Sequence, residues 1–168
     1  MDDISERRLS EVYPGLADKV RQMAEQLEQE GIDIRVTQSY RPWSEQAALY
    51  DQGRTSPGEI VTNARAGFSW HNFGLAVDVA PLIPQGVDWN TNHPAWLRIV
   101  AAGTSFGLVS GAEWRTFPDW PHFQLTGRFP VTPNDEVRAI YRTGGLAAVW
   151  ESAFNHVPVA DLSLQGDI

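Results

Sequence analysis

The stretch that decides how this chain folds lies at residues 69–80 and reads Ser69-Trp70-His71-Asn72-Phe73-Gly74-Leu75-Ala76-Val77-Asp78-Val79-Ala80. From Phe73 onward it alternates as a β-strand does, with large apolar side chains on one face and small residues around Asp78 on the other. The large side chains predict a face that packs into a core. The small ones leave open space in front of the Asp78 carboxylate, with His71 at the entrance of the strand, and this space is room for an ion.

A second stretch supplies further polar groups and reads Asp119-Trp120-Pro121-His122-Phe123-Gln124-Leu125. Its alternation predicts a short strand with two large apolar side chains on one side and two polar ones, His122 and Gln124, on the other. Pro121 marks the first residue of this strand or an edge position, because proline cannot donate to a β-ladder.

Two histidines and one aspartate are a sufficient ligand set for a catalytic zinc, which keeps a fourth position open for water. The candidates are His71, Asp78 and His122, and Asp119 is then a carboxylate near the metal that need not bind it. A lone His beside an Asp is more often a surface or capping pair. This chain has only four His, however, and two of them lie in apolar strand patterns next to carboxylates.

Together the two stretches resemble the zinc peptidases of bacterial cell walls. The pattern S-x-H-x-x-G-x-A-x-D begins at Ser69, and D-x-P-H-F-Q begins at Asp119. This family comprises D-alanyl-D-alanine carboxypeptidases and L-alanyl-D-glutamate endopeptidases, and is related in fold to lysostaphin-type enzymes and the hedgehog signalling domain. The chain is most similar to the endopeptidase branch, which includes phage endolysins, because the carboxypeptidase branch usually has Glu-x-x-His where this chain has Asp119-x-x-His122.

Further matches extend the resemblance over roughly residues 10–155, in the family's order. They are Ser39-Tyr40-Arg41 with Gln46, the loop at 58–63, and Gly111 with Trp114. The resemblance implies an α+β fold: a single domain with a central, mostly antiparallel sheet flanked by helices and a zinc site on the open face of the sheet. We expect one peptidase domain over residues 1–168, with a loose tail at 156–168.

The resemblance also implies roles for the site residues. One Zn²⁺ per chain would be held by His71, Asp78 and His122, and Asp119 would act as the acid/base carboxylate. Arg41 would stabilise the oxyanion or hold a substrate carboxylate. The alternative for Arg41 is a structural salt bridge or a helix-end contact.

Three further residues are candidates for substrate contact: Gln46, Ser69 and Trp114. Gln46 could equally be an amide on a helix surface, Ser69 could satisfy a backbone group, and Trp114 could be a core aromatic. Glu113 competes with Asp119 as the acid, but only Asp119 has the family's spacing from His122. The other two histidines are not placed on the metal: His93 is expected to cap a helix or contact solvent, and His156 lies near the tail.

Composition narrows the class of protein. The chain has 168 residues, 42% of them hydrophobic, with seven Trp and no Cys, which predicts a globular domain without disulfides or a thiolate metal site. A net charge of -8 argues against nucleic-acid binding. No apolar run follows the N-terminus as in a signal peptide, and none approaches the 18 or so residues of a membrane span. A monomer is the default expectation.

Periodicity and turn residues predict the remaining elements. Strands are expected at 32–37 and 108–109, loops at 54–68, 81–93 and 110–118, and helices at 13–31, 44–52, 94–105, 134–142 and 146–154. The last helix is expected to pack against the back of the sheet.

The function expected is cleavage of peptidoglycan stem peptides between L-Ala and D-Glu, by an enzyme made in the cytoplasm that reaches the cell wall by a route outside this chain. Two alternatives stay open: a D-alanyl-D-alanine carboxypeptidase or dipeptidase, and a non-catalytic, zinc-containing binding module.

Overall fold

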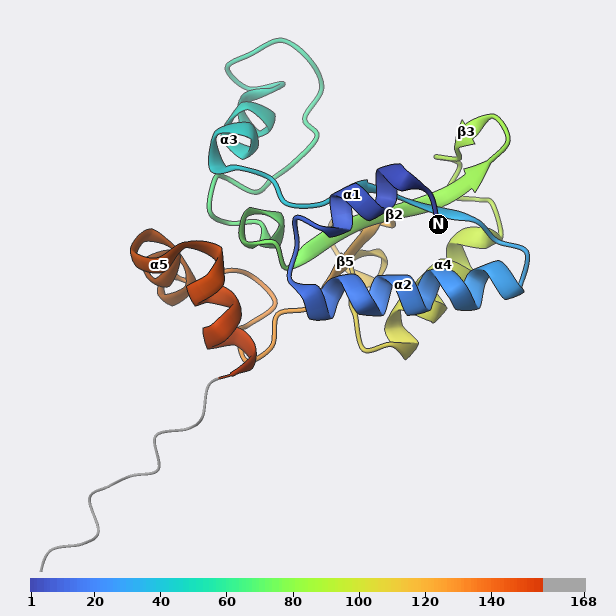
Figure 1. Ribbon diagram of the computed structural model, residues 1–168. Coiled ribbons are helices and arrows are strands. Elements are labelled where there is room, and N and C mark those ends of the chain that lie inside the picture. Colours follow the sequence, from blue (N-terminus) through green and yellow to red (C-terminus); the bar gives the residue numbers. More distant parts are fainter. Residues whose placement is uncertain (156–168) are drawn as a thin grey trace, which may run out of the picture.

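The structure of the chain is a computed structural model in which residues 1–155 are described (Figure 1). Its centre is a sheet with the strand order β1-β2-β5-β4, and β3 pairs with the far end of β2. All of these pairings are antiparallel, which confirms the expected α+β class. The strands are β1 Ile34–Gln38, β2 Ala76–Ile83, β3 Gly86–Val87, β4 Val109–Ser110 and β5 His122–Gln124. His156 and the predicted tail lie outside the described residues.

Three helices share the main core with the sheet: α1 Asp3–Leu9, α2 Pro14–Gln29 and α4 Ala95–Ser105. The expected helix at 13–31 is confirmed as α2. It begins at Pro14, where the missing N–H breaks no helical hydrogen bond. It ends at Gln29, and Gly31 turns the chain away with a left-handed φ of 76°. The core that these elements bury includes Leu9, Leu16, Val20, Met23, Leu27, Val36, Val77, Val79, Ile99 and Phe123.

The short helix α1 was not expected from the sequence. Its N-cap is Asp2, whose carboxylate accepts a hydrogen bond from the backbone N–H of Ser5 at 2.9 Å. The same carboxylate accepts a hydrogen bond of 2.7 Å from Arg35 Nε on β1. Asp2 therefore caps α1 and ties it to the edge of the sheet.

The stretch at 69–80 departs from the predicted strand at its beginning. Trp70–Phe73 is a single 3₁₀ turn, η1, which ends at Gly74 with a left-handed φ of 62°. Strand β2 starts only at Ala76, so Phe73 and Leu75 do not continue the apolar strand face. They pack instead in a second core cluster.

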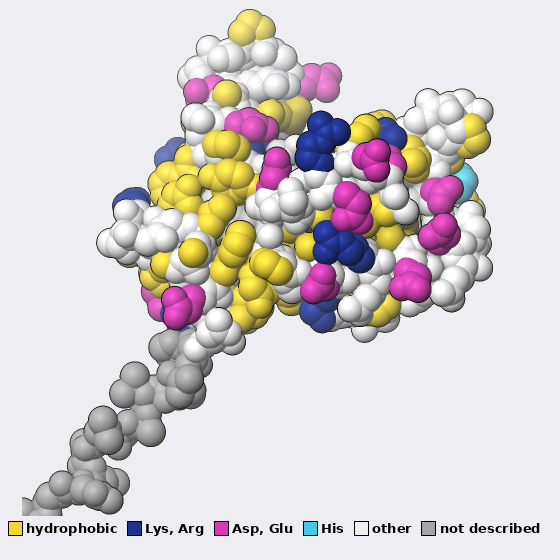
Figure 2. Space-filling model, viewed as in Figure 1, with side chains coloured by type: hydrophobic (Ala, Val, Ile, Leu, Met, Phe, Trp, Pro, Cys, Tyr) yellow, Lys and Arg dark blue, Asp and Glu magenta, His cyan; other side chains and the backbone are white. Residues whose placement is uncertain are grey.

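The second core cluster lies between η1 and the C-terminal helix α5, Asp135–Phe154. Asn134 caps α5 through Val137 N–H at 3.0 Å, and Gly145 kinks it at φ 67°, close to the predicted break. The expectation that the last helix packs against the back of the sheet is wrong. The helices α1, α2 and α4 cover that face, and α5 packs beside the sheet on η1 (Figure 1). Hydrophobic side chains gather along this junction (Figure 2).

The other predicted elements hold with local corrections. The helices at 44–52 and 94–105 are confirmed as α3 Trp43–Asp51 and α4. The prediction of a loop at 81–93 is wrong for its first residues, because β2 continues to Ile83 and the chain then turns back into β3. The loop at 110–118 contains a short 3₁₀ turn, η2 Gly111–Glu113. No helix within residues 1–155 has both the length and the apolar character needed to cross a bilayer.

Candidate metal centre and active-site cavity

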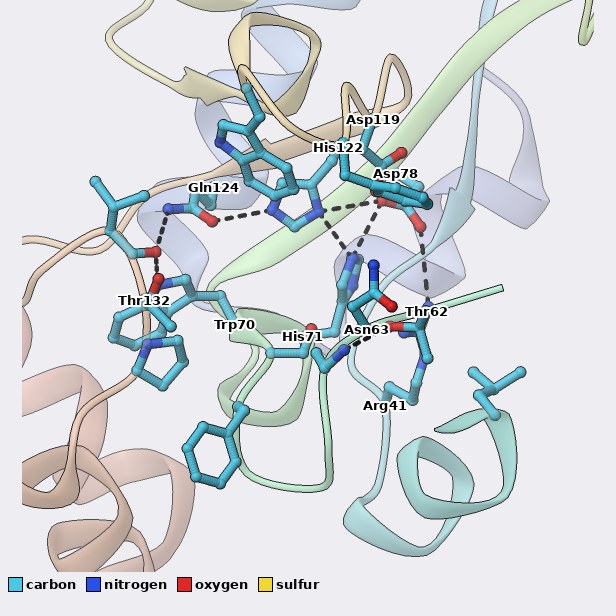
Figure 3. Close-up of a pocket in the computed structure, with 18 of the residues that line it drawn as sticks. Arg41, Thr62, Asn63, Trp70, His71, Asp78, Asp119, His122, Gln124 and Thr132 are labelled. Atoms are coloured by element: carbon cyan, nitrogen blue, oxygen red, sulfur yellow. Dashed lines mark hydrogen bonds and ion pairs between the residues drawn. The ribbon is translucent and has the colours of Figure 1, made fainter. Parts of the chain in front are cut away.

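Three potential metal ligands converge from three elements (Figure 3). His71 comes from η1, Asp78 from β2 and His122 from β5, and one donor atom from each lies within 4.8 Å of the others. His71 Nε2 is 3.1 Å from Asp78 Oδ1 and 3.2 Å from His122 Nδ1. The structure therefore brings together the three residues that the sequence predicted as ligands.

The hydrogen bonds behind the two imidazoles fix which nitrogens face the centre. His71 Nδ1 lies 2.8 Å from the carbonyl oxygen of Ser39, which can only accept, so Nδ1 carries the proton. His122 Nε2 lies 3.0 Å from Gln124 Oε1, and the Gln124 amide is oriented by donating to Val131 O at 2.9 Å. In both rings the nitrogen that faces the centre thus presents a lone pair.

A cation fits this arrangement. With both imidazoles neutral, two lone pairs and a carboxylate oxygen meet without a proton between them, which is favourable only when a positive charge lies among them. Two imidazole nitrogens and one carboxylate oxygen are donors that suit Zn²⁺, and three protein ligands leave a coordination position open. His71 and His122 are buried, and the Asp78 side chain is 20% exposed.

The charges in the centre favour an ionised Asp78. Burial alone raises the pKa of Asp78. Without a metal, attraction to an imidazolium at His71 and a hydrogen bond from an imidazolium at His122 outweigh burial and hold this pKa well below its usual range. Burial lowers the pKa of His122, and the contacts with Asp78 reverse that effect so that the net pKa is raised. Both shifts arise from the pairing of the Asp78 carboxylate with positively charged imidazoles, and a bound cation would supply that positive charge in place of the protons.

Asp119 lines the same cavity and is not part of the ligand cluster. Burial and then the neighbouring Asp78 charge raise the pKa of Asp119. Its backbone N–H donates to Gly111 O at 2.9 Å, and a Cβ on Gly111 would lie 2.7 Å from Asp119 O and 2.9 Å from His122 Cβ. The lack of a side chain at Gly111 therefore allows the start of η2 to pack closely against Asp119 and His122. Glu113, the competing acid, is exposed and does not line the cavity.

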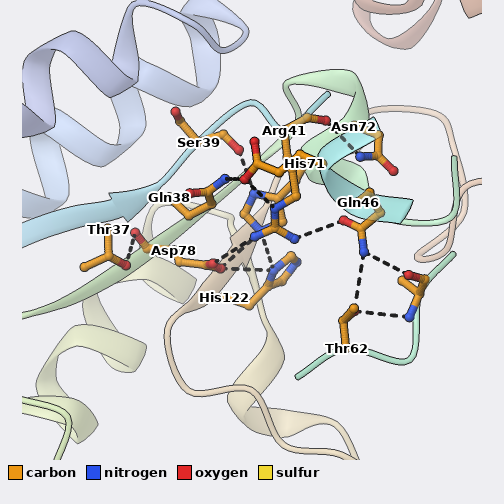
Figure 4. A network of polar contacts seen from close by, with 12 residues as sticks. Thr37, Gln38, Ser39, Arg41, Gln46, Thr62, His71, Asn72, Asp78 and His122 are labelled. Carbon is orange, nitrogen blue, oxygen red and sulfur yellow. Dashed lines mark hydrogen bonds and ion pairs between the residues drawn. The ribbon is translucent and has the colours of Figure 1, made fainter. Parts of the chain in front are cut away.

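Arg41 follows the end of β1 and points toward the metal centre (Figure 4). Its backbone N–H donates to His71 O at 3.0 Å, and its Nη2 lies 3.9 Å from Asp78 Oδ2. Its Nη1 donates to Gln46 Oε1 at 3.0 Å. Arg41 thus places a cation beside the candidate ligands without hydrogen-bonding to them.

The centre lies at the base of an open cavity of about 630 Å³, which is within the range of ligand sites. Ser69 and Trp114 line this cavity, and the Trp114 ring lies 4.9 Å from the His122 ring between centroids. Gln46 does not line it. Gln46 is fully buried beneath Arg41, so it is not an amide on the helix surface. His93 caps α4 as expected, since its Nδ1 accepts from Ala95 N–H at 3.2 Å.

Several cavity residues were not predicted as site residues. Gln124 accepts the hydrogen bond from His122 Nε2, and its place on the same strand face as His122 could have identified it as a site residue. Most of the remaining walls come from the loops at 54–68 and 110–118 and from the segment at 131–133, where no periodic pattern exists to single out a position. These wall residues are Val61, Thr62, Asn63, Ala64, Phe68, Thr116, Phe117, Val131, Thr132 and Pro133, and Leu49 and Trp70 complete the lining.

A buried His-Asp-His set beside a second carboxylate and an arginine, at the base of an open cavity, defines a metallopeptidase-type site. A family model described as D-alanyl-D-alanine carboxypeptidase matches residues 62–125. The structure is similar to the crystal structure of the Serratia marcescens L-Ala D-Glu endopeptidase ChiX, with a TM-score of 0.54. The two sequences are 30% identical, and the match covers 75% of this chain and 89% of ChiX. The chain belongs to this family of peptidases.

Two further comparisons are a sequence match to CwlK and a solved structure, VanY, that shares the fold. The peptidoglycan L-alanyl-D-glutamate endopeptidase CwlK of Bacillus subtilis (strain 168) is 41% identical in an alignment 103 residues long, which covers 56% of this chain and 62% of CwlK. The match therefore spans less than two thirds of CwlK. The vancomycin resistance D,D-pentapeptidase VanY, solved in complex with Zn(II), shares the fold with a TM-score of 0.55 at 14% identity, over 80% of each chain.

Proposed function

We propose that this chain is a zinc peptidase that cleaves peptidoglycan stem peptides between L-Ala and D-Glu. The observation that carries the proposal is the convergence of three lone-pair donors, with their imidazole protons fixed on the far side, next to the free carboxylate of Asp119. Both ChiX and CwlK are named as endopeptidases for this bond. The Zn(II) in VanY supports zinc as the metal.

The proposed metal would be held by His71, Asp78 and His122, one ion per chain. When bound, zinc supplies a Lewis acid that acidifies water and polarises a peptide carbonyl. Asp119 accepts a proton from the attacking water and returns it to the leaving amine nitrogen. Burial, the largest cause of the raised pKa of Asp119, does not depend on the metal and makes this carboxylate a stronger base.

Arg41 stabilises the negative charge that develops on the carbonyl oxygen, or holds a substrate carboxylate nearby. A guanidinium that is largely removed from water interacts strongly with such charge, and the Arg41 side chain is only 13% exposed. The open cavity favours an endopeptidase, because a stem peptide continues on both sides of the cleaved bond. Every group named comes from one chain, so the proposed site is complete in a monomer.

Mass spectrometry of stem peptides incubated with the protein tests the proposal. We expect a cut between L-Ala and D-Glu that stops with a chelator and returns when zinc is added. Release of a terminal D-Ala would point to the carboxypeptidase alternative. Zinc binding with no cleavage of any stem peptide would refute the proposed enzymatic activity and favour a non-catalytic binding module.

A further inference from the structure

Gln46, in the first turn of α3, is a buried amide with a partner at each end. Its side chain has no exposed surface. Oε1 accepts from Arg41 Nη1 at 3.0 Å, and Nε2 donates to Ala64 O at 2.8 Å (Figure 4). Because the two ends of the amide differ chemically, these bonds fix its orientation.

The two partners of Gln46 both line the cavity, although Gln46 does not. Arg41 faces the metal centre, and Ala64 belongs to a wall segment that we define as residues 62–64. Gln46 Nε2 also lies 3.5 Å from Thr62 Oγ1 in that segment. One buried side chain therefore connects the cation of the site to the wall segment beside it.

The free donors of Arg41 show why its position needs support. Arg41 Nε is buried without a hydrogen-bond partner among the described residues, and Nη2 stays 3.9 Å from Asp78 Oδ2, beyond hydrogen-bond distance. Arg41 Nε is also 3.9 Å from Glu45 Oε1. Without the bond to Gln46, either carboxylate could draw the guanidinium into a direct ion pair.

We propose that Gln46 is a positioning residue, which holds the Arg41 guanidinium short of contact with Asp78 and fixes the wall segment relative to it. The donors of Arg41 then stay available to the substrate, and Asp78 keeps its oxygens for the metal. This inference rests on the proposed function where it assigns Arg41 to the substrate. The position of the Arg41 side chain can be measured without any assay of peptide cleavage.

A double-mutant cycle tests the inference on the zinc-loaded protein. We expect Arg41→Met to lower kcat/KM for the stem peptide about 100-fold and Gln46→Met to lower it at least about 10-fold, with zinc content unchanged. In the Arg41→Met background, Gln46→Met should cost less than about twofold more. Losses that multiply in the double variant would overturn the proposal, because Gln46 would then act on substrate or fold independently of Arg41.

Gln52→Met is the matched control. Gln52 also bonds a loop carbonyl, Glu59 O at 3.0 Å, but it does not contact Arg41 and lies outside the cavity. We expect its kcat/KM to stay within about twofold of the parent. If Gln46→Met does not fold, Gln46→Glu keeps the acceptor for Arg41 and should retain more activity than Gln46→Ala, and equal losses would count against the proposal.

Nuclear magnetic resonance gives a readout that does not depend on activity. The Nε–H resonance of Arg41, assigned by its absence in Arg41→Met, should shift in Gln46→Met and stay in place in Gln52→Met. An unchanged resonance in folded Gln46→Met would overturn the positioning role. A parent protein that cleaves no peptide would refute the proposed function and still leave this comparison decisive for Gln46.

Discussion

Asp78 and His122 are registered partners across the antiparallel pair β2 and β5, with Asp78 Oδ1 3.5 Å from His122 Nδ1. Directly opposed residues on one face of a sheet lie close enough for their side chains to meet. The sheet thus places two of the three candidate ligands, and η1 adds His71 from the segment that leads into β2. A metal at this point would join η1 and β2 to β5, which lies much later in the sequence.

Removal of zinc should therefore lower stability as well as activity. We expect chelation to lower the unfolding free energy by about 4 kcal/mol relative to zinc at 1,000 times its Kd. In a chain of this size that corresponds to a fall in Tm of roughly 10 °C, measurable by calorimetry. His93→Ala is the control, since His93 only caps α4, and it should show the same chelator effect as the parent. A Tm that does not respond to zinc in the parent would contradict the ligand set.

Replacement of Asp119 should separate catalysis from metal binding. We expect Asp119→Asn to lower kcat by about 10²- to 10⁴-fold, because the proton acceptor is lost, while the zinc content stays that of the parent. Glu113→Gln removes an exposed carboxylate outside the cavity and should keep kcat within about twofold. Full activity in Asp119→Asn would remove this residue from the mechanism.

Gln124 should affect zinc affinity through His122. Gln124→Leu removes the acceptor for His122 Nε2–H, so the imidazole is no longer held in the tautomer that presents Nδ1 to the metal. We expect zinc to bind about 10- to 100-fold more weakly, measured by competition with a chromogenic chelator. Gln124→Glu restores an acceptor and should recover part of this loss. Equal affinities in Gln124→Leu and the parent would show that the tautomer is fixed by another contact.

Asp2 should contribute a pH-dependent part of the stability. Burial raises the pKa of Asp2, but hydrogen bonds from Ser5 and the Arg35 contact outweigh it, so the pKa in the folded state is lowered. The contribution is then fully present above the unfolded-state pKa of about 3.9 and is lost as the pH falls through the lower folded-state pKa. We expect Asp2→Ala to cost about 1 kcal/mol at pH 7.

The matching measurement is denaturant unfolding at several pH values. The difference between Asp2→Ala and the parent should be constant from pH 7 to pH 5 and should shrink below about pH 4. Asp2→Asn keeps a capping oxygen for Ser5 but loses the charge, and should cost less than Asp2→Ala. A difference that grows toward acid pH would have the wrong sign for a carboxylate with a lowered pKa.

The sequence predicted the ligand-bearing elements because strand alternation and spacing are local properties. The alternation of side chains with a period of two places Asp78 and His122 on the polar faces of their strands. The fold class was predicted from the family resemblance. The beginning of β2 was mispredicted, because Gly74 fits an alternating pattern and its left-handed φ leaves no trace in that pattern. The helix α1 is only seven residues long, too short for a reliable apolar period.

The rest of the site depends on long-range packing. The apolar positions of α5 predict a buried face but not its partner, and the partner is η1 with the second core cluster. The burial of Gln46 was equally hidden, because its two hydrogen bonds reach Arg41 at the end of a strand and Ala64 in an irregular loop. Local patterns carry no information about such contacts.

Titration of metal-free protein with zinc, followed by the rate of stem-peptide cleavage, tests the central claim most directly. We expect activity to rise in proportion to added zinc and to stop rising at one zinc per chain, with a product fragment that ends at L-Ala. We also expect His71→Ala, Asp78→Ala and His122→Ala each to abolish this break point. Cleavage that is independent of zinc, or a protein saturated with zinc that leaves every stem peptide intact, would contradict the account.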